Sequence, residues 1–272
     1  MPGCLCGCAP ELGRRGFFAA AVAAAAFPAR GFSAEPAPAA DPVLIDDIVT
    51  ANHILYDQGV VDGFGHISAR HDKDPSRYLL SRSMAPALVT EADVMEFDLD
   101  SNAIDPRGRT PYLERFIHGE IYKLRPDVMA IVHSHSPAVL PFADTGVPLL
   151  PMNHIAGFLG AGPPVFEIRT VAGDASDMLV RNNDIGKALA KTLGPHPVAL
   201  MRGHGSVAAA QSVKHVVFRA VYTEVNARTE GEALKIGKPT FLNEKEAAAA
   251  AKTNDGLVGR PWELWKQRVM SK

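Results

Sequence analysis

The sequence predicts an α/β protein in which helices cover both faces of a sheet, that is, a three-layer α/β/α sandwich. Two observations support this fold class. Short apolar segments typical of strands recur along the chain, and longer segments with helical spacing of apolar residues flank them. In addition, 47% of the 272 residues are hydrophobic and 21% are charged. That composition supplies a sizeable core and excludes an intrinsically disordered chain.

The overall charge of the chain limits its partners. A formal net charge of −2 gives no electrostatic basis for binding nucleic acid or an anionic membrane surface. Aromatic residues make up only 7% of the chain, which disfavours a platform for base stacking. We therefore expect a small-molecule substrate, with no nucleic-acid partner.

The first segment, residues 1–40, has the organisation of an export signal. Arg14 and Arg15 precede an Ala/Val-rich run, which small residues and prolines follow. The paired arginines resemble a twin-arginine signal, so we expect a periplasmic protein that has no membrane association after processing. The alternative is an unstructured tail on a cytoplasmic protein. Because all three cysteines lie within the first eight residues, processing would leave no thiol for catalysis or disulfides.

Helix and strand signals then alternate over residues 41–272, for which we predict a single domain with a C-terminal helical tail. Asp41 and Pro42 are typical of an N-cap and first helical position. The helix that ends before Arg125 does so because Pro126 follows. The predicted helices are 42–58, 113–124, 174–193 and 211–234, with a short Ala-rich helix and a segment bearing Trp262 and Trp265 after them. The predicted strands are 66–70, 77–81, 94–99, 128–133 and 198–201, with a capped turn at 90–93.

Three histidines stand at the ends of predicted strands. His133 and His135 are two residues apart, and side chains at that spacing on a strand share one face. His204 closes a second strand between Gly203 and Gly205, whose flexibility allows a sharp turn. Three neutral imidazoles with an open fourth position are typical of a catalytic divalent-metal site.

Four segments together resemble the class II aldolase/adducin family, and the resemblance covers about residues 43–235. The segments are Gly65–Arg70, Leu113–His118, Ile131–His135 and Leu200–Gly205, with Arg125–Asp127 between the second and the third. The resemblance implies the three-layer sandwich of the class II aldolase type. It also implies a four-fold homotetramer with active sites between subunits. Trp262 and Trp265 would either cover a neighbour's site or pack on their own subunit.

The resemblance also implies roles for individual residues. His133, His135 and His204 would bind one divalent ion per subunit, and Glu114 would be a ligand and the acid/base. Zinc is the expected ion, although imidazole also suits manganese, cobalt, iron and nickel. His118, four residues after Glu114, would either support the site or pack in the core.

The sequence departs from the family's sugar-phosphate enzymes where those enzymes hold the phosphate. His66 occupies the position of an Asn, and Tyr112 and Leu113 replace a pair of serines before the acidic residue. A phosphate needs several backbone or hydroxyl donors in a tight concavity, which Tyr and Leu do not supply. We therefore expect an unphosphorylated substrate with flat, apolar parts. His66, Arg82, Ser83 and Tyr112 are its expected binding residues, with Arg82 suited to a carboxylate.

These departures resemble the branch of the family that decarboxylates hydroxylated aromatic acids. The leading hypothesis is therefore a metal-dependent carbon–carbon lyase that releases carbon dioxide, with Glu114 or His154 protonating the ring. One alternative is a class II aldolase that cleaves a non-phosphorylated hydroxy-keto substrate. Another is a non-catalytic, adducin-like assembly module. The intact set of three histidines and Glu114 weighs against that last alternative.

Overall fold

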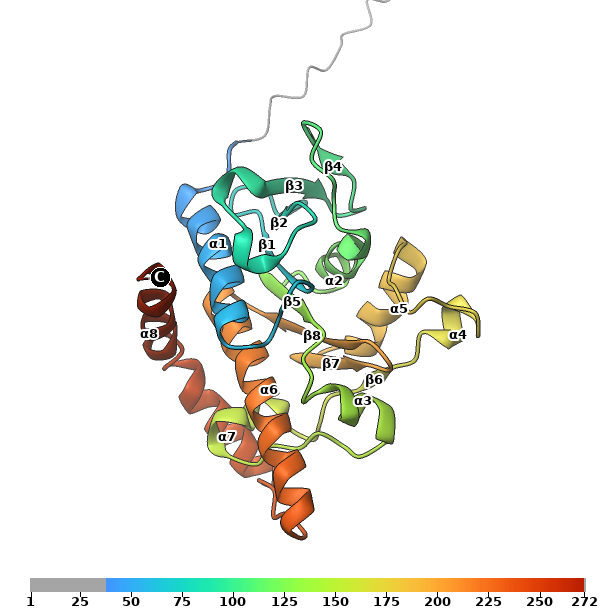
Figure 1. The fold of residues 1–272 in the computed structure, drawn as a ribbon, viewed down its shortest axis with the longest axis vertical. Coiled ribbons are helices and arrows are strands. Elements are labelled where there is room, and N and C mark those ends of the chain that lie inside the picture. The colour runs from blue at the N-terminus through green and yellow to red at the C-terminus, as the bar shows by residue number, and fades with distance from the viewer. Residues whose placement is uncertain (1–37, 272) are drawn as a thin grey trace, which may run out of the picture. The chain divides into compact units, whose positions relative to one another are not determined.

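The computed structural model describes residues 38–271, whose strands form one eight-stranded sheet with the order β4-β3-β2-β1-β5-β8-β7-β6 (Figure 1). The strands are β1 (His66–Arg70), β2 (Arg77–Ser81), β3 (Val94–Asp98), β4 (Ala103–Ile104), β5 (Ala130–Ser134), β6 (Val165–Phe166), β7 (Val198–Met201) and β8 (Gly205–Ala210). Neighbouring strands are antiparallel except β6 and β7, which are parallel. Residues 1–37 of the expected leader, with the paired arginines and the cysteines, lie outside the described residues.

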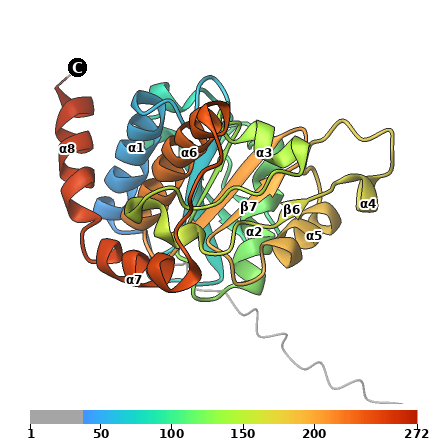
Figure 2. The same ribbon diagram turned by 90° about the horizontal axis from the view of Figure 1, so that it is seen from below.

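Helices cover both faces of this sheet. They are α1 (Pro42–Asp57), α2 (Phe116–Leu124), α3 (Leu140–Thr145), α4 (Arg169–Ala172), α5 (Asn183–Leu193), α6 (Val213–Ile236), α7 (Glu244–Asp255) and α8 (Gly259–Met270). The 3-10 turns are η1 (Pro86–Leu88), η2 (Glu91–Asp93), η3 (Leu113–Arg115) and η4 (His154–Leu159). Figure 2 shows α1, α6 and α8 on one side of the sheet and α2 and α5 on the other. Each side has its own apolar core, so the three-layer α/β/α sandwich is confirmed.

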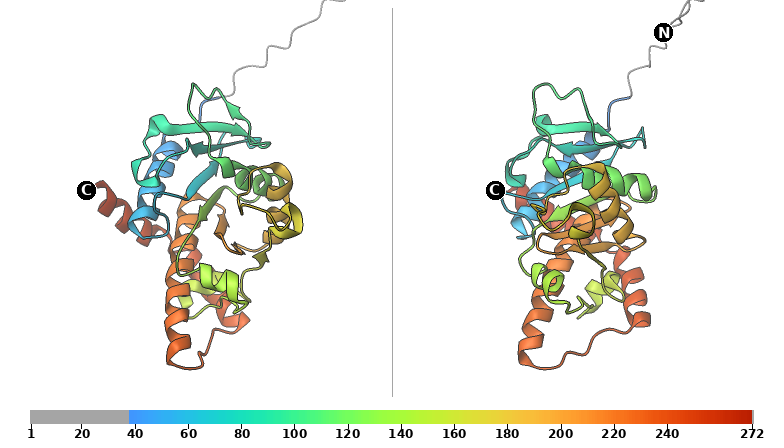
Figure 3. Two further views of the ribbon diagram at one scale, coloured as in Figure 1. Left: turned by 45° about the vertical axis from the view of Figure 1, so that its right-hand side comes forward. Right: turned by 90° about the vertical axis from the view of Figure 1, so that its right-hand side faces the viewer.

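The C-terminal helices pack on the same chain. Trp262 and Trp265 of α8 are buried in the apolar core that α1 and α6 form. Both side chains therefore pack on their own subunit. The turn η4 packs against both α6 and α7 (Figure 3). Among the described residues, no helix combines the length and the apolar character that crossing a membrane requires.

Most predicted elements are present, with two informative differences. The helix predicted from 174 begins only at Asn183, because Asn182 caps it by accepting a hydrogen bond from the amide of Ile185. The preceding residues form an irregular segment that reaches the site described below. Strand β8 is the second difference, because its Ala-rich composition is weak in strand propensity and does not predict a strand. Its burial between β5 and β7 compensates for that weakness, because the small side chains pack on both faces.

Candidate metal centre

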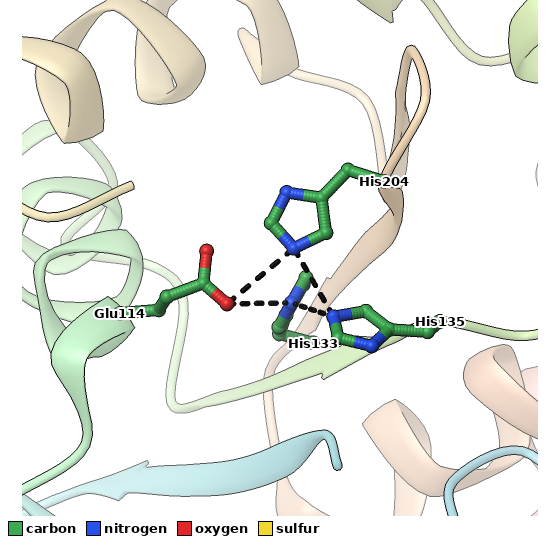
Figure 4. Close-up of side chains that lie close together, drawn as sticks. All are labelled: Glu114, His133, His135 and His204. Atoms are coloured by element: carbon green, nitrogen blue, oxygen red, sulfur yellow. Dashed lines mark hydrogen bonds and ion pairs between the residues drawn. The ribbon is translucent and has the colours of Figure 1, made fainter. Parts of the chain in front are cut away.

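Four side chains from three separate parts of the chain converge on one point (Figure 4). Glu114 comes from η3, His133 and His135 from the end of β5, and His204 from the turn between β7 and β8. Nε2 of His135 lies 3.1 Å from Nε2 of His133 and 3.1 Å from Nε2 of His204. Oε2 of Glu114 lies 3.5 Å from Nε2 of His133 and 3.4 Å from Nε2 of His204.

These separations fit a bound divalent ion. A tetrahedral zinc ion with bonds of about 2.0–2.1 Å has ligand atoms about 3.3–3.4 Å apart, close to the observed separations. His133 also has the required tautomer, because its Nδ1 lies 3.1 Å from the carbonyl oxygen of Ser206 and must donate a hydrogen to it. Its Nε2 therefore directs a lone pair into the cluster. A cation between the four converging atoms would stabilise them at such short range.

The backbone on either side of His204 is held by a helix and by a neighbouring strand. The turn before His204 is fixed by Asp144 of α3, whose carboxylate accepts a hydrogen bond of 2.6 Å from the amide of Gly203. Gly205 lies so close to β5 that an added Cβ would collide with the carbonyl oxygen of Ser134. Only glycine therefore lets the two ligand-bearing segments approach to this distance.

Glu114 is buried, and both of its carboxylate oxygens are engaged. Oε1 accepts a hydrogen bond of 3.0 Å from the amide of Val180, which belongs to the irregular segment before α5. Burial opposes ionisation of the carboxyl, but interaction with the imidazoles of His133 and then His204 favours the carboxylate and outweighs burial. The pKa of Glu114 is therefore held well below its ordinary value. In the resting site Glu114 is thus a carboxylate that can accept a proton.

Of the three histidines in the cluster, His135 is the one that lines a pocket. Burial, with the like charges of His133 and His204, lowers the pKa of His135 to about 4. At neutral pH its imidazole is therefore uncharged and free to bind a cation. The ring of Phe64 stacks beside it with a centroid separation of 6.1 Å.

The pocket beside the cluster is open and largely apolar. Its volume is ≈ 400 Å³, and the described residues that line it include no Lys or Arg. The lining residues are Gly63, Phe64, Gly65, His66, Ser83, Met84, Ala85, Tyr112, Leu113, Glu114, His135 and Leu179. Phe64 and Leu113 are the large apolar side chains left exposed here, at 68% and 61%.

His66 and Tyr112 form one wall of this pocket, next to the cluster. Their rings are 4.5 Å apart between centroids, and His66 lies opposite His133 on the paired strands β1 and β5. The hydroxyl of Tyr112 donates a short hydrogen bond to the carbonyl of Met84. His118 is fully buried and hydrogen-bonds to His66, so it supports the site from behind.

Two of the residues expected at the site lie away from the pocket in the folded protein. Arg82 turns away to pair with Asp93, with 2.6 Å between Nε and Oδ1, and does not line the pocket. His154 begins η4 and is exposed beside α7, where its carbonyl accepts a hydrogen bond from Asn254. Neither side chain joins the cluster within this chain. Sequence spacing could not reveal this, because the partners of both residues are distant along the chain.

Other residues at the site carried no usable signal in the sequence. Phe64 and Met84 follow turn-like segments, and only the fold shows that those segments face each other across one pocket. Val180 contributes a backbone amide, which any residue could supply. Asp144 and Glu224 act through hydrogen bonds to loops that are distant in sequence.

Comparison with known proteins agrees with this geometry. Residues 46–230 match the family described as the class II aldolase and adducin N-terminal domain. Decarboxylase tropJ of Talaromyces stipitatus is 34% identical over 244 residues, which cover 81% of this chain and 92% of that protein. The 3,4-dihydroxyphthalate decarboxylase of Arthrobacter keyseri is 31% identical over 195 residues, which cover 66% of this chain and 74% of that protein.

A solved structure of another protein has the same fold. The L-fuculose 1-phosphate aldolase from Glaciozyma antarctica PI12 superposes with a TM-score of 0.70 at 21% identity, covering 84% of this chain and 88% of that one. The cluster of three histidines and a glutamate, the matched residues and the shared sheet all agree. The chain therefore belongs to the class II aldolase and adducin family.

Proposed function

We propose that this protein is a divalent-metal-dependent decarboxylase of hydroxylated aromatic acids. The observation that carries the proposal is the ligand cluster at the base of an apolar pocket that also presents His66 and Tyr112. Phe64 and Leu113 of the pocket lining offer apolar surface to an aromatic ring, and its acidic groups would then face the cluster. Two relatives of the chain are named decarboxylases, one of them for 3,4-dihydroxyphthalate, which supports the same class of substrate.

The pocket disfavours a sugar phosphate. A phosphate dianion is bound by Arg or Lys or by several converging amides and hydroxyls. Here Tyr112 and Leu113 fill the wall before Glu114, and Arg82 is already paired with Asp93. A flat ring with a carboxylate has fewer polar atoms to satisfy and more apolar surface to bury.

Residues of this chain can carry the proton steps. A divalent ion held by His133, His135 and His204 would supply positive charge beside the oxygens of the substrate. Glu114, held as a carboxylate, takes the proton of the phenol that lies next to the leaving carboxylate. The phenolate makes the ring carbon that bears the carboxylate electron-rich, and Glu114 returns its proton to that carbon. The carbon–carbon bond then breaks, carbon dioxide leaves, and the electron pair of that bond restores the aromatic ring as a phenolate. A proton from water restores the phenol.

His154 is not needed for this sequence of proton transfers. It lies outside the pocket within its own chain, whereas Glu114 lies in the pocket lining. We therefore assign the transferred proton to Glu114 alone.

An aldolase is the second candidate, because the same cluster would stabilise an enediolate and the solved relative is an aldolase. A panel of hydroxylated benzoates and phthalates, incubated with the zinc-loaded protein, separates the two. We expect carbon dioxide release and the decarboxylated phenol, and neither product with His204→Ala. Aldehyde formation from hydroxy-keto acids, with no carbon dioxide from any aromatic acid, would replace the decarboxylase proposal.

Zinc is the proposed ion because three nitrogens and one oxygen in tetrahedral arrangement suit it. Metal analysis of the purified protein tests this choice against manganese, cobalt, iron and nickel. We also propose a homotetramer, as the resemblance to the class II aldolase family implies. Light scattering coupled to size exclusion would give the mass of the particle.

Export to the periplasm is a proposal that depends on the leader. Fractionation of cells that express the full chain, compared with the double change Arg14→Lys and Arg15→Lys, tests it. Retention of the changed protein in the cytoplasm supports a twin-arginine signal. Equal distribution of the two proteins would remove that proposal.

A further inference from the structure

A chain of four buried side chains runs from the core to the pocket. The hydroxyls of Tyr122 and Ser68 are 2.8 Å apart, and Oγ of Ser68 lies 2.6 Å from Nδ1 of His118. Nε2 of His118 in turn lies 2.7 Å from Nδ1 of His66. All four residues are at most 3% exposed, so water does not compete for these hydrogen bonds. The catalytic steps above make no use of this chain.

The direction of the hydrogen bonds follows from Tyr122, the innermost member. Among the described residues, its hydroxyl has one hydrogen-bond partner, Ser68. If Ser68 donated to Tyr122, the phenolic hydrogen would be buried without an acceptor, which costs about 1–3 kcal/mol. Leaving an oxygen lone pair unused costs less, because an oxygen has two of them. Tyr122 therefore donates, and Ser68 accepts.

The donor and acceptor roles of Ser68, His118 and His66 can then be assigned in only one way. Ser68 has a single hydrogen, which it gives to Nδ1 of His118. His118 must accept there, so its imidazole is neutral and carries its hydrogen on Nε2. That hydrogen is donated to Nδ1 of His66, which also accepts and also carries its hydrogen on Nε2. His66 lines the pocket, and Nε2 is the nitrogen left for a ligand.

We propose that Tyr122 and Ser68, acting through His118, hold His66 as a hydrogen-bond donor with its Nε2–H available to the pocket. The Nε2–H group of His66 donates to an oxygen of the substrate, such as a carboxylate or a phenolic oxygen beside the cluster. Identifying that acceptor as a substrate carboxylate rests on the proposed function, whereas the tautomer rests only on the hydrogen-bond chain. Tyr122, Ser68 and His118 are thus positioning residues, and His66 makes the contact.

The tautomer can be measured without any substrate. Zinc-loaded protein with 15N-labelled histidine would be examined by NMR, and the signals assigned with His66→Asn and His118→Asn variants. We expect both His66 and His118 to carry hydrogen on Nε2 and to have an unprotonated Nδ1. A hydrogen on Nδ1 of His66 would overturn the proposal.

Ligand binding gives an independent test. Salicylate binding to the zinc-loaded protein would be measured by calorimetry for wild type, Tyr122→Phe and Tyr78→Phe. Tyr78 is a matched control because its buried hydroxyl, whose acceptors are Ser101 and the carbonyl of Arg115, belongs to the same core but not to this chain of bonds. We expect about a three- to tenfold loss of affinity for Tyr122→Phe, as one well-placed hydrogen bond predicts, and little change for Tyr78→Phe.

A double-mutant cycle distinguishes positioning from general loosening. If Tyr122 acts through His66, then His66→Asn combined with Tyr122→Phe should bind salicylate no more weakly than His66→Asn alone. Additive losses, or equal losses for Tyr122→Phe and Tyr78→Phe, would contradict the proposal. The Nε2–H tautomer together with no decarboxylation of any aromatic acid would instead contradict the proposed function and leave the hydrogen-bond chain in place.

Discussion

Glu224 of α6 accepts a hydrogen bond from the hydroxyl of Ser136, the residue that follows the ligand His135. The same carboxylate oxygen accepts the amide of Ala138 at 3.2 Å, and both Glu224 and Ser136 are buried. The end of β5 is thereby tied to a helix on one face of the sheet. His135 lies just beyond the last residue of that strand, so this link restrains the backbone next to it.

We therefore expect Ser136→Ala to weaken zinc binding while the protein stays folded. Partners that orient a metal ligand typically contribute about 10–100-fold in affinity, and one of several such bonds should contribute at the lower end. Competition with a chromophoric chelator measures the affinity. Ser76→Ala is the control, since Ser76 is exposed and its hydroxyl donates to Asp74, away from the cluster. Equal zinc affinity in Ser136→Ala and wild type would show that the link does not act on His135.

Removal of a ligand should abolish metal binding outright. His204→Ala leaves two imidazoles and one carboxylate, and we expect less than one ion per ten chains after dialysis, roughly a hundredfold or greater loss of affinity. Elemental analysis by mass spectrometry measures the ion content. His196→Ala, a partly exposed histidine before β7, is the control and should keep its metal. Stoichiometric metal in His204→Ala would refute the ligand assignment.

Glu114→Gln separates proton transfer from metal binding. The amide keeps the size of the side chain and can still accept the hydrogen bond from Val180, but it cannot carry the transferred proton. We expect metal to be retained and kcat to fall by about 10²–10⁴-fold, the usual contribution of a general acid or base. A turnover close to wild type would move the proton transfer to another group.

Glu230 of α6 predicts a pH dependence of stability away from the site. Its side chain is fully buried, its Oε2 accepts the amide of Leu150, and its Oε1 has no hydrogen-bond partner among the described residues. Burial raises the pKa of Glu230 to about 7. Between the ordinary carboxyl pKa and this value the folded protein binds more protons than the unfolded chain, so stability falls as the pH rises through that window.

Glu230→Gln imitates the protonated carboxyl and should remove this loss. We expect the variant and wild type to melt alike near pH 5 and the variant to be more stable at pH 8, by at most about 3 kcal/mol. Thermal unfolding over this pH range provides the measurement. Parallel pH profiles for the two proteins would mean that Glu230 does not titrate in this window.

Elements that depend on residues close together in the chain could be predicted from the sequence. The spacing of His133 and His135 on an apolar strand indicated a shared face, and Thr90 with Asp93 indicated a capped turn, which η2 confirms. Such signals persist because they depend on neighbours a few residues apart. The resemblance of the ligand segments to a known family identified Glu114 and His204 before any geometry was available.

Contacts between side chains that are distant in sequence became visible only in the folded protein. It turned Arg82 toward Asp93, placed His154 beside α7, and showed that the residues predicted as the start of a helix instead bring the amide of Val180 to Glu114. It also joined His66 to Tyr122 through His118, although these residues lie on β1 and α2. Long-range pairing of this kind depends on strand order, register and burial, which no local pattern encodes.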